Sequence, residues 1–196
     1  ASRLVARRAS HTDDPKLRSA LAVEAARDIA ADGDIDTATE VLLTAMAAPS
    51  RKLPLLLCLA DLAQRHGRMW VAARAYEDVA ALLAGFAADQ TGPEPLEIAT
   101  RFPSRDSANR AAAFYYHAAA RLHAQASEQS EDAVTALERA AACVPSDVLI
   151  GLELASAYRS QGATDQARSQ LQRLLASAHA ANSHGAARLH FELAEL

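Results

Sequence analysis

The sequence predicts an all-α fold, and three features of the 196-residue chain support this prediction. Alanine dominates the composition, and it is the strongest helix former because it loses no side-chain entropy in a helix. Few runs of β-branched residues are present from which strands could form. Small and apolar residues also recur at an interval of 34 positions, the length of a helix–turn–helix repeat.

The 34-residue interval occurs in both halves of the chain. The pairs of residues that it relates are Gly33 and Gly67, Ala38 and Ala72, Leu42 and Tyr76, Ala45 and Val79, Ala133 and Ala167, Leu137 and Leu171, and Ala140 and Leu174. A small residue where two helices cross lets their backbones approach, and larger neighbours fill the grooves beside it. The glycine is expected to end the first helix of a pair, because glycine adopts the left-handed conformation without steric strain.

One segment, 148–181, carries the whole pattern, with Leu154-Ala155, Tyr158, Gly162, Ala167, Leu171 and Leu174. This pattern resembles the tetratricopeptide repeat, although the early tryptophan of that family is missing and alanine replaces its first glycine. The resemblance implies a right-handed α-solenoid of antiparallel helix pairs, in a single array over 1–196. The segments that match, about four in number, are 19–52, 53–86, 112–147 and 148–181.

The remaining segments are the two ends and an insertion. The basic stretch 1–10 is expected to be a solvated helix face, and no motif is assigned to it. Residues 87–111 contain three prolines and are expected to be mainly a mobile connector, with a ligand-binding loop as the alternative. Within it, 95–102 is expected to form one or two short helical turns, and the helix that follows is expected to be longer than its counterparts.

The C-terminal stretch 186–196 repeats the first-helix pattern and then stops. Its apolar residues Leu189, Leu193 and Leu196 need a surface that covers them. We therefore expect either a fragment of a longer array or a homodimer that packs through this helix, since terminal repeats normally carry a polar outer face.

No motif for catalysis, a cofactor or a metal is recognised, so the chain is predicted not to be an enzyme and to need no cofactor or metal. A phosphate-binding loop, an H-E-x-x-H and a C-x-x-C are all absent from the sequence. The net charge of −4 does not indicate the basic surface that nucleic-acid binding needs. No apolar run is long enough to insert in a membrane. Cys58 and Cys143 are expected as buried free thiols, which favours a cytoplasmic location.

The resemblance implies a concave groove lined by the first helices. The candidate groove residues that it implies are Glu24, Arg27, Asp61, Arg65, Tyr116, His117, His123, Glu153 and Arg159. Tyr116 has two interpretations: it is packed between helices, as aromatic residues at helical spacing usually are, or it is exposed with both histidines and anchors a peptide. The family's clamp for chaperone tails is not reproduced, so that class of partner is not expected.

These expectations together predict a protein–protein interaction scaffold that binds a peptide or helix of a partner protein in its groove, within a larger protein. Two alternatives stay open. The first is a regulatory sensor module that controls a linked effector domain. The second is a self-association module that dimerises through the C-terminal helix.

Overall fold

The computed structural model describes residues 2–48, 51–89, 95–126, 131–180 and 186–195. Regular structure in these ranges is helical, with no β-strand, which confirms the predicted all-α class. The described helices are α1 (Ser2–Ser10), α2 (Pro15–Ala31), α3 (Ile35–Ala47), α4 (Lys52–Arg65), α5 (Met69–Asp89), α6 (Pro95–Arg101), α7 (Arg105–Ala126), α8 (Glu131–Cys143), α9 (Val148–Ser160), α10 (Thr164–Ala180) and α11 (Ala186–Ala194).

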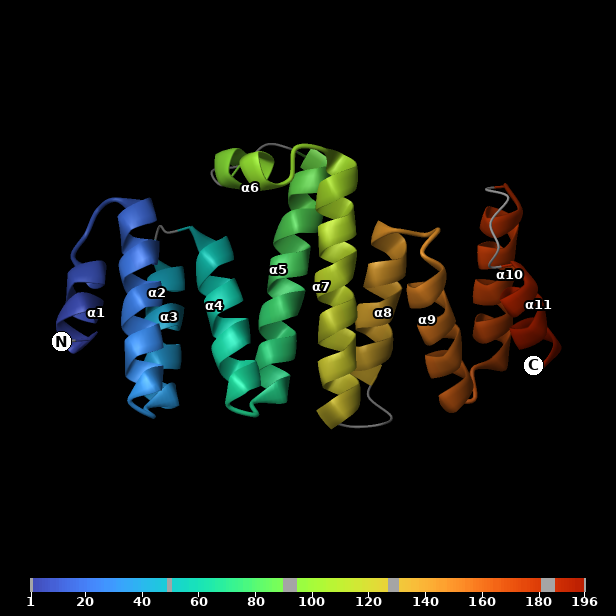
Figure 1. Cartoon of the computed structure of the whole chain (residues 1–196), viewed down its shortest axis with the longest axis horizontal. Helices are drawn as coiled ribbons and strands as arrows, with labels where there is room; N and C mark the ends of the chain where they lie inside the picture. The colour runs from blue at the N-terminus through green and yellow to red at the C-terminus, as the bar shows by residue number, and fades with distance from the viewer. Residues whose placement is uncertain (1, 49–50, 90–94, 127–130, 181–185, 196) are drawn as a thin grey trace.

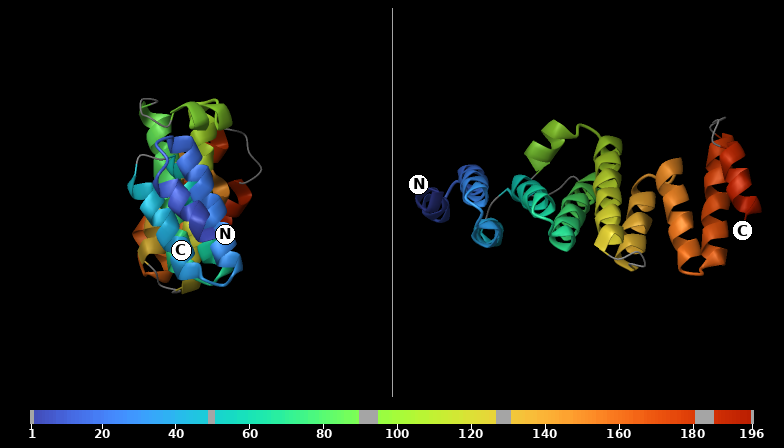
Figure 2. Two further views of the ribbon diagram at one scale, coloured as in Figure 1. Left: turned by 90° about the vertical axis from the view of Figure 1, so that its left-hand side faces the viewer. Right: turned by 60° about the horizontal axis from the view of Figure 1, so that its bottom comes forward.

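The helices stand side by side in one row, and the two termini lie at opposite ends of it (Figure 1). Each helix packs on the next one along the chain, except that α5 packs directly on α7 and α6 lies beside the upper end of α5. In Figure 2, the left view looks along the row from the N-terminal side, and the right view shows the same elongated row. Order along the chain is therefore order in space, and contacts are mostly between neighbouring helices.

Glycine ends the first helix of three pairs, as predicted. Gly33, Gly67 and Gly162 have φ angles of 91°, 72° and 75°. The residue after each glycine donates its N–H to a carbonyl five residues earlier: Asp34 to Ile29 at 3.2 Å, Arg68 to Ala63 at 2.8 Å, and Ala163 to Tyr158 at 2.9 Å. This geometry satisfies the last carbonyls of a helix and turns the chain sharply. An aspartate then caps α3, since Asp34 accepts the N–H of Thr37.

Alanines occupy the helix crossings at the predicted interval. In the second helices, Ala38, Ala72 and Ala167 are fully buried and Ala133 is 8% exposed. In the first helices, the alanines in place of the family's glycine are buried as well, and they are Ala26, Ala60, Ala119 and Ala155. Larger side chains such as Leu42 and Leu171 fill the space around them. The small residues thus set how closely the helices approach.

The insertion is helical and packed over much of its length. α5 continues to Asp89 and α7 begins at Arg105, so both helices run into the predicted connector 87–111. The short turns expected within 95–102 are present as α6, whose Ile98 is 2% exposed in a cluster with Leu83 and Ala112. The predicted connector is therefore helical at 87–89, 95–101 and 105–111, and its mobility stays a prediction. Residues 90–94 lie outside the described part of the chain.

The C-terminal helix α11 packs on α10. Leu189 is fully buried in one cluster with Leu171 and Leu174, and Leu193 packs against that cluster. The expectation that Leu189 needs a cover from outside the chain is wrong, because α10 supplies it. Phe191 is the exposed apolar residue of this helix, at 64%. Leu196 lies outside the described residues.

Two Gly→Ala variants test the role of the turn glycines. Neither Gly67 nor Gly85 has an atom within 4 Å of the Cβ that alanine would add, so only the backbone differs between the two sites. Gly67→Ala should lower the free energy of unfolding by about 1–2 kcal/mol, because an L-residue is strained at positive φ. Gly85→Ala in the middle of α5 should raise it by up to about 1 kcal/mol. Urea unfolding followed by circular dichroism measures the free energy of unfolding of both variants. A loss of equal size at both sites would contradict the role of positive φ at Gly67.

A second variant tests the hydrogen bond between α9 and α8. The Tyr158 hydroxyl donates to Glu138 Oε1 at 2.6 Å, and burial together with this carboxylate raises the pKa of Tyr158 to about 12. Because the folded pKa lies above the unfolded value of about 10, this group contributes stability that is full below pH 10 and is lost as the pH rises towards 12. Tyr158→Phe should lose less stability over that window than the parent protein in alkaline urea titrations. If stability fell with pH to the same extent in both proteins, the Tyr158–Glu138 hydrogen bond would not be the cause of the fall.

Candidate binding face

The predicted groove residues lie on α2, α4, α7 and α9. Contacts join some of these residues across neighbouring helices. His117 Nε2 on α7 lies 2.6 Å from Glu153 Oε2 on α9, and Arg159 on α9 lies 3.5 Å from Glu192 on α11. One of these contacts thus joins two predicted residues, His117 and Glu153, and we call the surface that carries the exposed candidates of α2, α4, α7 and α9 the first-helix face.

The N-terminal half of this face carries charges of both signs. Glu24 and Arg27 are exposed on α2. Asp61 and Arg65 form an ion pair of 2.8 Å along α4, with their side chains 43% and 72% exposed. Exposed pairs of this kind contribute little to stability, so these charges remain available to a ligand.

The two cysteines are both free. Cys58 is buried on α4 and Cys143 is partly buried on α8. Burial raises the pKa of both thiols, and for Cys58 a nearby Arg27 acts in the opposite direction without overcoming burial. Since the thiolate is the reactive form, neither residue has the environment of a nucleophilic cysteine.

Tyr116 and His123 do not line a groove, so their placement there is wrong. Tyr116 is 6% exposed within the cluster that holds Val79 and Ile150, and Arg139 lies over its ring at 5.9 Å. Burial raises the pKa of its hydroxyl. His123 is 2% exposed and faces α5. The interpretation that the aromatic stretch packs between helices therefore holds for Tyr116.

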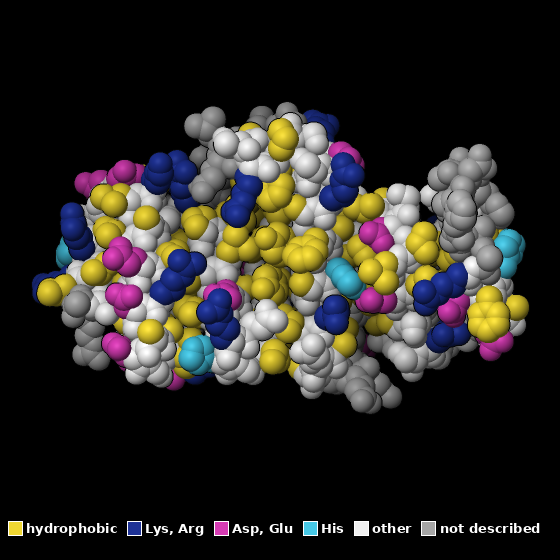
Figure 3. Space-filling view, viewed as in Figure 1, with side chains coloured by type: hydrophobic (Ala, Val, Ile, Leu, Met, Phe, Trp, Pro, Cys, Tyr) yellow, Lys and Arg dark blue, Asp and Glu magenta, His cyan; other side chains and the backbone are white. Residues whose placement is uncertain are grey.

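The exposed member of the aromatic stretch is Phe114, at 64%. It meets Tyr115 edge-on with 5.3 Å between ring centroids, and Tyr115 stacks on Tyr76 of α5 at 5.8 Å. We call these three residues the aromatic cluster. Hydrophobic side chains gather at the centre of the surface over α4, α5 and α7, with charged groups to both sides (Figure 3). The sequence interpretation missed Phe114 as a surface residue and assigned Tyr76 only to helix packing.

Polar groups border the aromatic cluster. The Tyr76 hydroxyl donates to Gln64 Oε1 of α4 at 3.1 Å. Burial raises the pKa of Tyr76, and the negative charge of Asp61 adds to this shift, so that carboxylate lies within electrostatic reach of the ring. The cluster therefore combines an exposed ring, two partly buried rings, an amide and a carboxylate.

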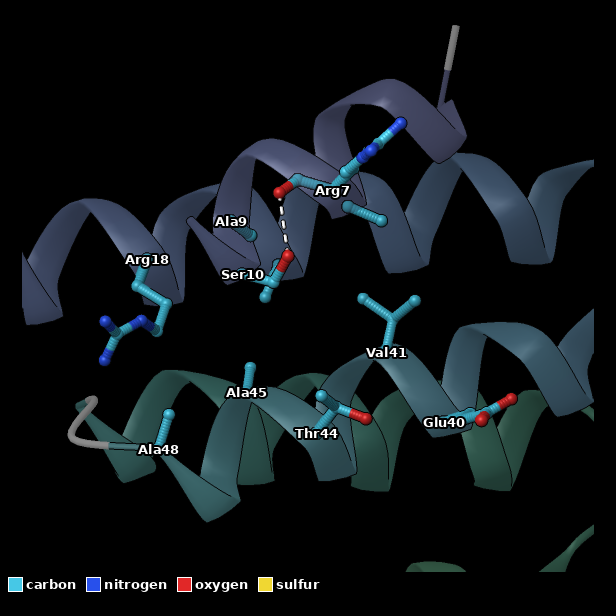
Figure 4. A pocket seen from close by; sticks show the side chains of 11 residues that line it. Arg7, Ala9, Ser10, Arg18, Glu40, Val41, Thr44, Ala45 and Ala48 are labelled. Atoms are coloured by element: carbon cyan, nitrogen blue, oxygen red, sulfur yellow. Dashed lines mark hydrogen bonds between the residues drawn. The ribbon is translucent and has the colours of Figure 1, made fainter. Parts of the chain in front are cut away.

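Two cavities open between helices elsewhere. One, of about 280 Å³, lies between α7, α8 and α9 and is lined mainly by small residues, with Arg121 and Glu153 as its charged side chains. The other, of about 380 Å³, lies between α1, α2 and α3. Figure 4 shows Ser10 and Val41 facing each other across the second cavity, whereas Arg7 points away from α3. Five of its eleven lining residues are alanines, and its charged side chains are Arg7, Arg18 and Glu40.

No protein-family model matches the chain, and a search of curated proteins finds no match. Among the described residues, no three or more His, Cys, Asp or Glu side chains are grouped closely enough to hold a metal ion. None of the described helices is both long enough and apolar enough to cross a membrane.

His123 forms a buried pair that joins the two long central helices. Its Nε2 lies 3.0 Å from Glu77 Oε1 on α5, and Arg74 holds the other oxygen of Glu77 at 3.0 Å. The side chains of His123 and Glu77 are only 2% and 8% exposed, whereas that of Arg74 is 55% exposed.

Removing one partner of the His123–Glu77 pair should be costly. His123→Leu should lower the free energy of unfolding by about 3 kcal/mol, because it leaves a buried carboxylate with one exposed partner. The double variant with Glu77→Leu should recover a large part of this loss, since no buried charge then remains. Guanidinium unfolding of the two single variants and the double variant measures this coupling. Strictly additive losses would contradict an interaction between the two side chains.

Proposed function

We propose that the chain is a right-handed α-solenoid of tetratricopeptide-like helix pairs whose first-helix face binds a peptide or helix of a partner protein. The row of helices, the buried alanines at a 34-residue interval and the three glycine turns support this architecture. Solenoids of this kind bind partners along the surface that the stacked repeats share.

Phe114 is the observation that carries the binding proposal. It is a large apolar side chain, 64% exposed, three residues before His117 on α7, and His117 pairs with Glu153 of α9. Covering such a side chain contributes on the order of 2 kcal/mol to binding, and aromatic anchors are typical of binding hot spots. A continuous first-helix face with an aromatic anchor is therefore better suited to a chain segment than to a small reactive substrate.

The charges of the first-helix face supply specificity in this proposal. Glu24 and Arg27 lie at one end of it, and the pairs His117–Glu153 and Arg159–Glu192 lie towards the other. Alternating signs of charge fix the direction in which a partner segment lies and reject segments with the wrong pattern. The mechanism is complementarity of shape and charge, with no covalent step.

A random-peptide display selection on the purified protein tests this function. Peptides that bind should lose affinity by about tenfold or more with Phe114→Ala, because the anchor is removed. Leu43→Ala is the matched control, since Leu43 is a 52% exposed apolar residue on α3, a second helix. Anisotropy titrations with labelled peptides measure both variants. Equal losses with both variants, or a loss with Leu43→Ala alone, would contradict binding at the first-helix face.

A further inference from the structure

The aromatic cluster has the geometry of a platform for flat rings. The rings of Tyr76 and Tyr115 are nearly parallel, at 22°, and the ring of Phe114 stands at 78° to that of Tyr115. The rings come from two helices, α5 and α7, so their relative placement is fixed by helix packing. Such an arrangement offers both ring faces and ring edges to a ligand within a short distance.

We propose that the aromatic cluster binds a proline-rich segment in the polyproline II conformation with an arginine or lysine beside the prolines. This inference rests on the proposed function, because it names the class of partner for the same face. A polyproline II segment turns once every three residues and rises about 3.1 Å per residue, so every third side chain faces the platform. Its conformation is already ordered before binding, which lowers the entropy lost on docking.

The polar groups beside the rings favour this ligand over a helix. Gln64 is exposed and lies within hydrogen-bond distance of the Tyr76 hydroxyl, so an amide and a phenol stand together at the edge of the cluster. A polyproline II backbone has no internal hydrogen bonds, so its carbonyls can accept from the NH2 group of Gln64, whose Oε1 already accepts from the Tyr76 hydroxyl. A helical ligand uses most of its carbonyls internally and would gain little from this pair.

The carboxylate of Asp61 favours a basic residue next to the prolines. Its side chain is 43% exposed, and its partner Arg65 is itself 72% exposed on the same helix. An exposed ion pair contributes little, so a guanidinium of the ligand can replace Arg65 without a large loss. Asp61 lies one turn of α4 before Gln64, whose side-chain oxygen accepts from the Tyr76 hydroxyl, so the carboxylate and the edge of the aromatic cluster share this part of α4. An arginine or lysine next to a proline of the ligand can then pair with Asp61 while the prolines pack on the aromatic cluster.

Synthetic peptides test this inference directly. The probe is a run of prolines with one arginine at its end, and the control peptide has the same length and charge but is built from glycine and serine. The proline peptide should bind at least tenfold tighter in anisotropy titrations. Phe114→Ala should weaken that binding about tenfold or more, and Leu43→Ala should leave it unchanged. Asp61→Asn should remove the preference for the arginine and reduce the dependence on salt.

Two outcomes would overturn the inference: equal binding of the proline and glycine–serine peptides, or proline binding that Phe114→Ala does not change. These outcomes are separable from a failure of the proposed function. If display selection yields ligands that depend on Phe114 but contain no proline motif, the binding face stands and the polyproline assignment is wrong. If neither experiment yields a ligand that depends on Phe114, both proposals fail.

Discussion

The close approach of helices at buried alanines is the contact on which the rest of the structure depends. Ala38, Ala72 and Ala167 have no exposed surface; Ala26 lies in one core cluster with Ala38, and Ala155 lies in another with Ala167. A methyl group at a crossing lets two backbones come near enough for larger side chains on either side to interlock. Because alanine gains little from its own burial, stability comes from these flanking contacts, and it builds up from one pair to the next along the row.

The surface that we propose to bind a partner depends on this packing. It brings side chains far apart in the sequence together, such as His117 of α7 and Glu153 of α9, whose atoms Nε2 and Oε2 lie 2.6 Å apart. The longest helices, α5 and α7, meet at the centre of the row and bring Tyr76 next to Tyr115. The buried His123–Glu77 pair joins the same two helices from within. The aromatic cluster therefore lies on the part of the row where the structure is most extensively packed.

The features that recur with the repeat could be predicted from the sequence. The direction in which an individual side chain points around its helix could not. Ala72 and Gly67 follow from spacing alone, because crossings and turns recur with the repeat. Three adjacent aromatic residues, 114–116, carry no such signal, since one position along a helix rotates a side chain by about 100°. The sequence therefore left Tyr116 with two interpretations, packed between helices or exposed in the groove, and did not single out Phe114. His123 and Glu77 are 46 positions apart, and the burial of Leu189 depends on α10, so neither contact is visible in a local pattern.

Small-angle X-ray scattering from monodisperse protein tests the central claim most directly, because stacking by alanine contacts makes an open row. A compact protein of this length has a radius of gyration of about 16 Å. The account predicts a clearly larger value, together with a pair-distance distribution that has a long tail. A radius of gyration near 16 Å with a symmetrical distribution would show a closed bundle, and would contradict both the row and the continuous face that it presents.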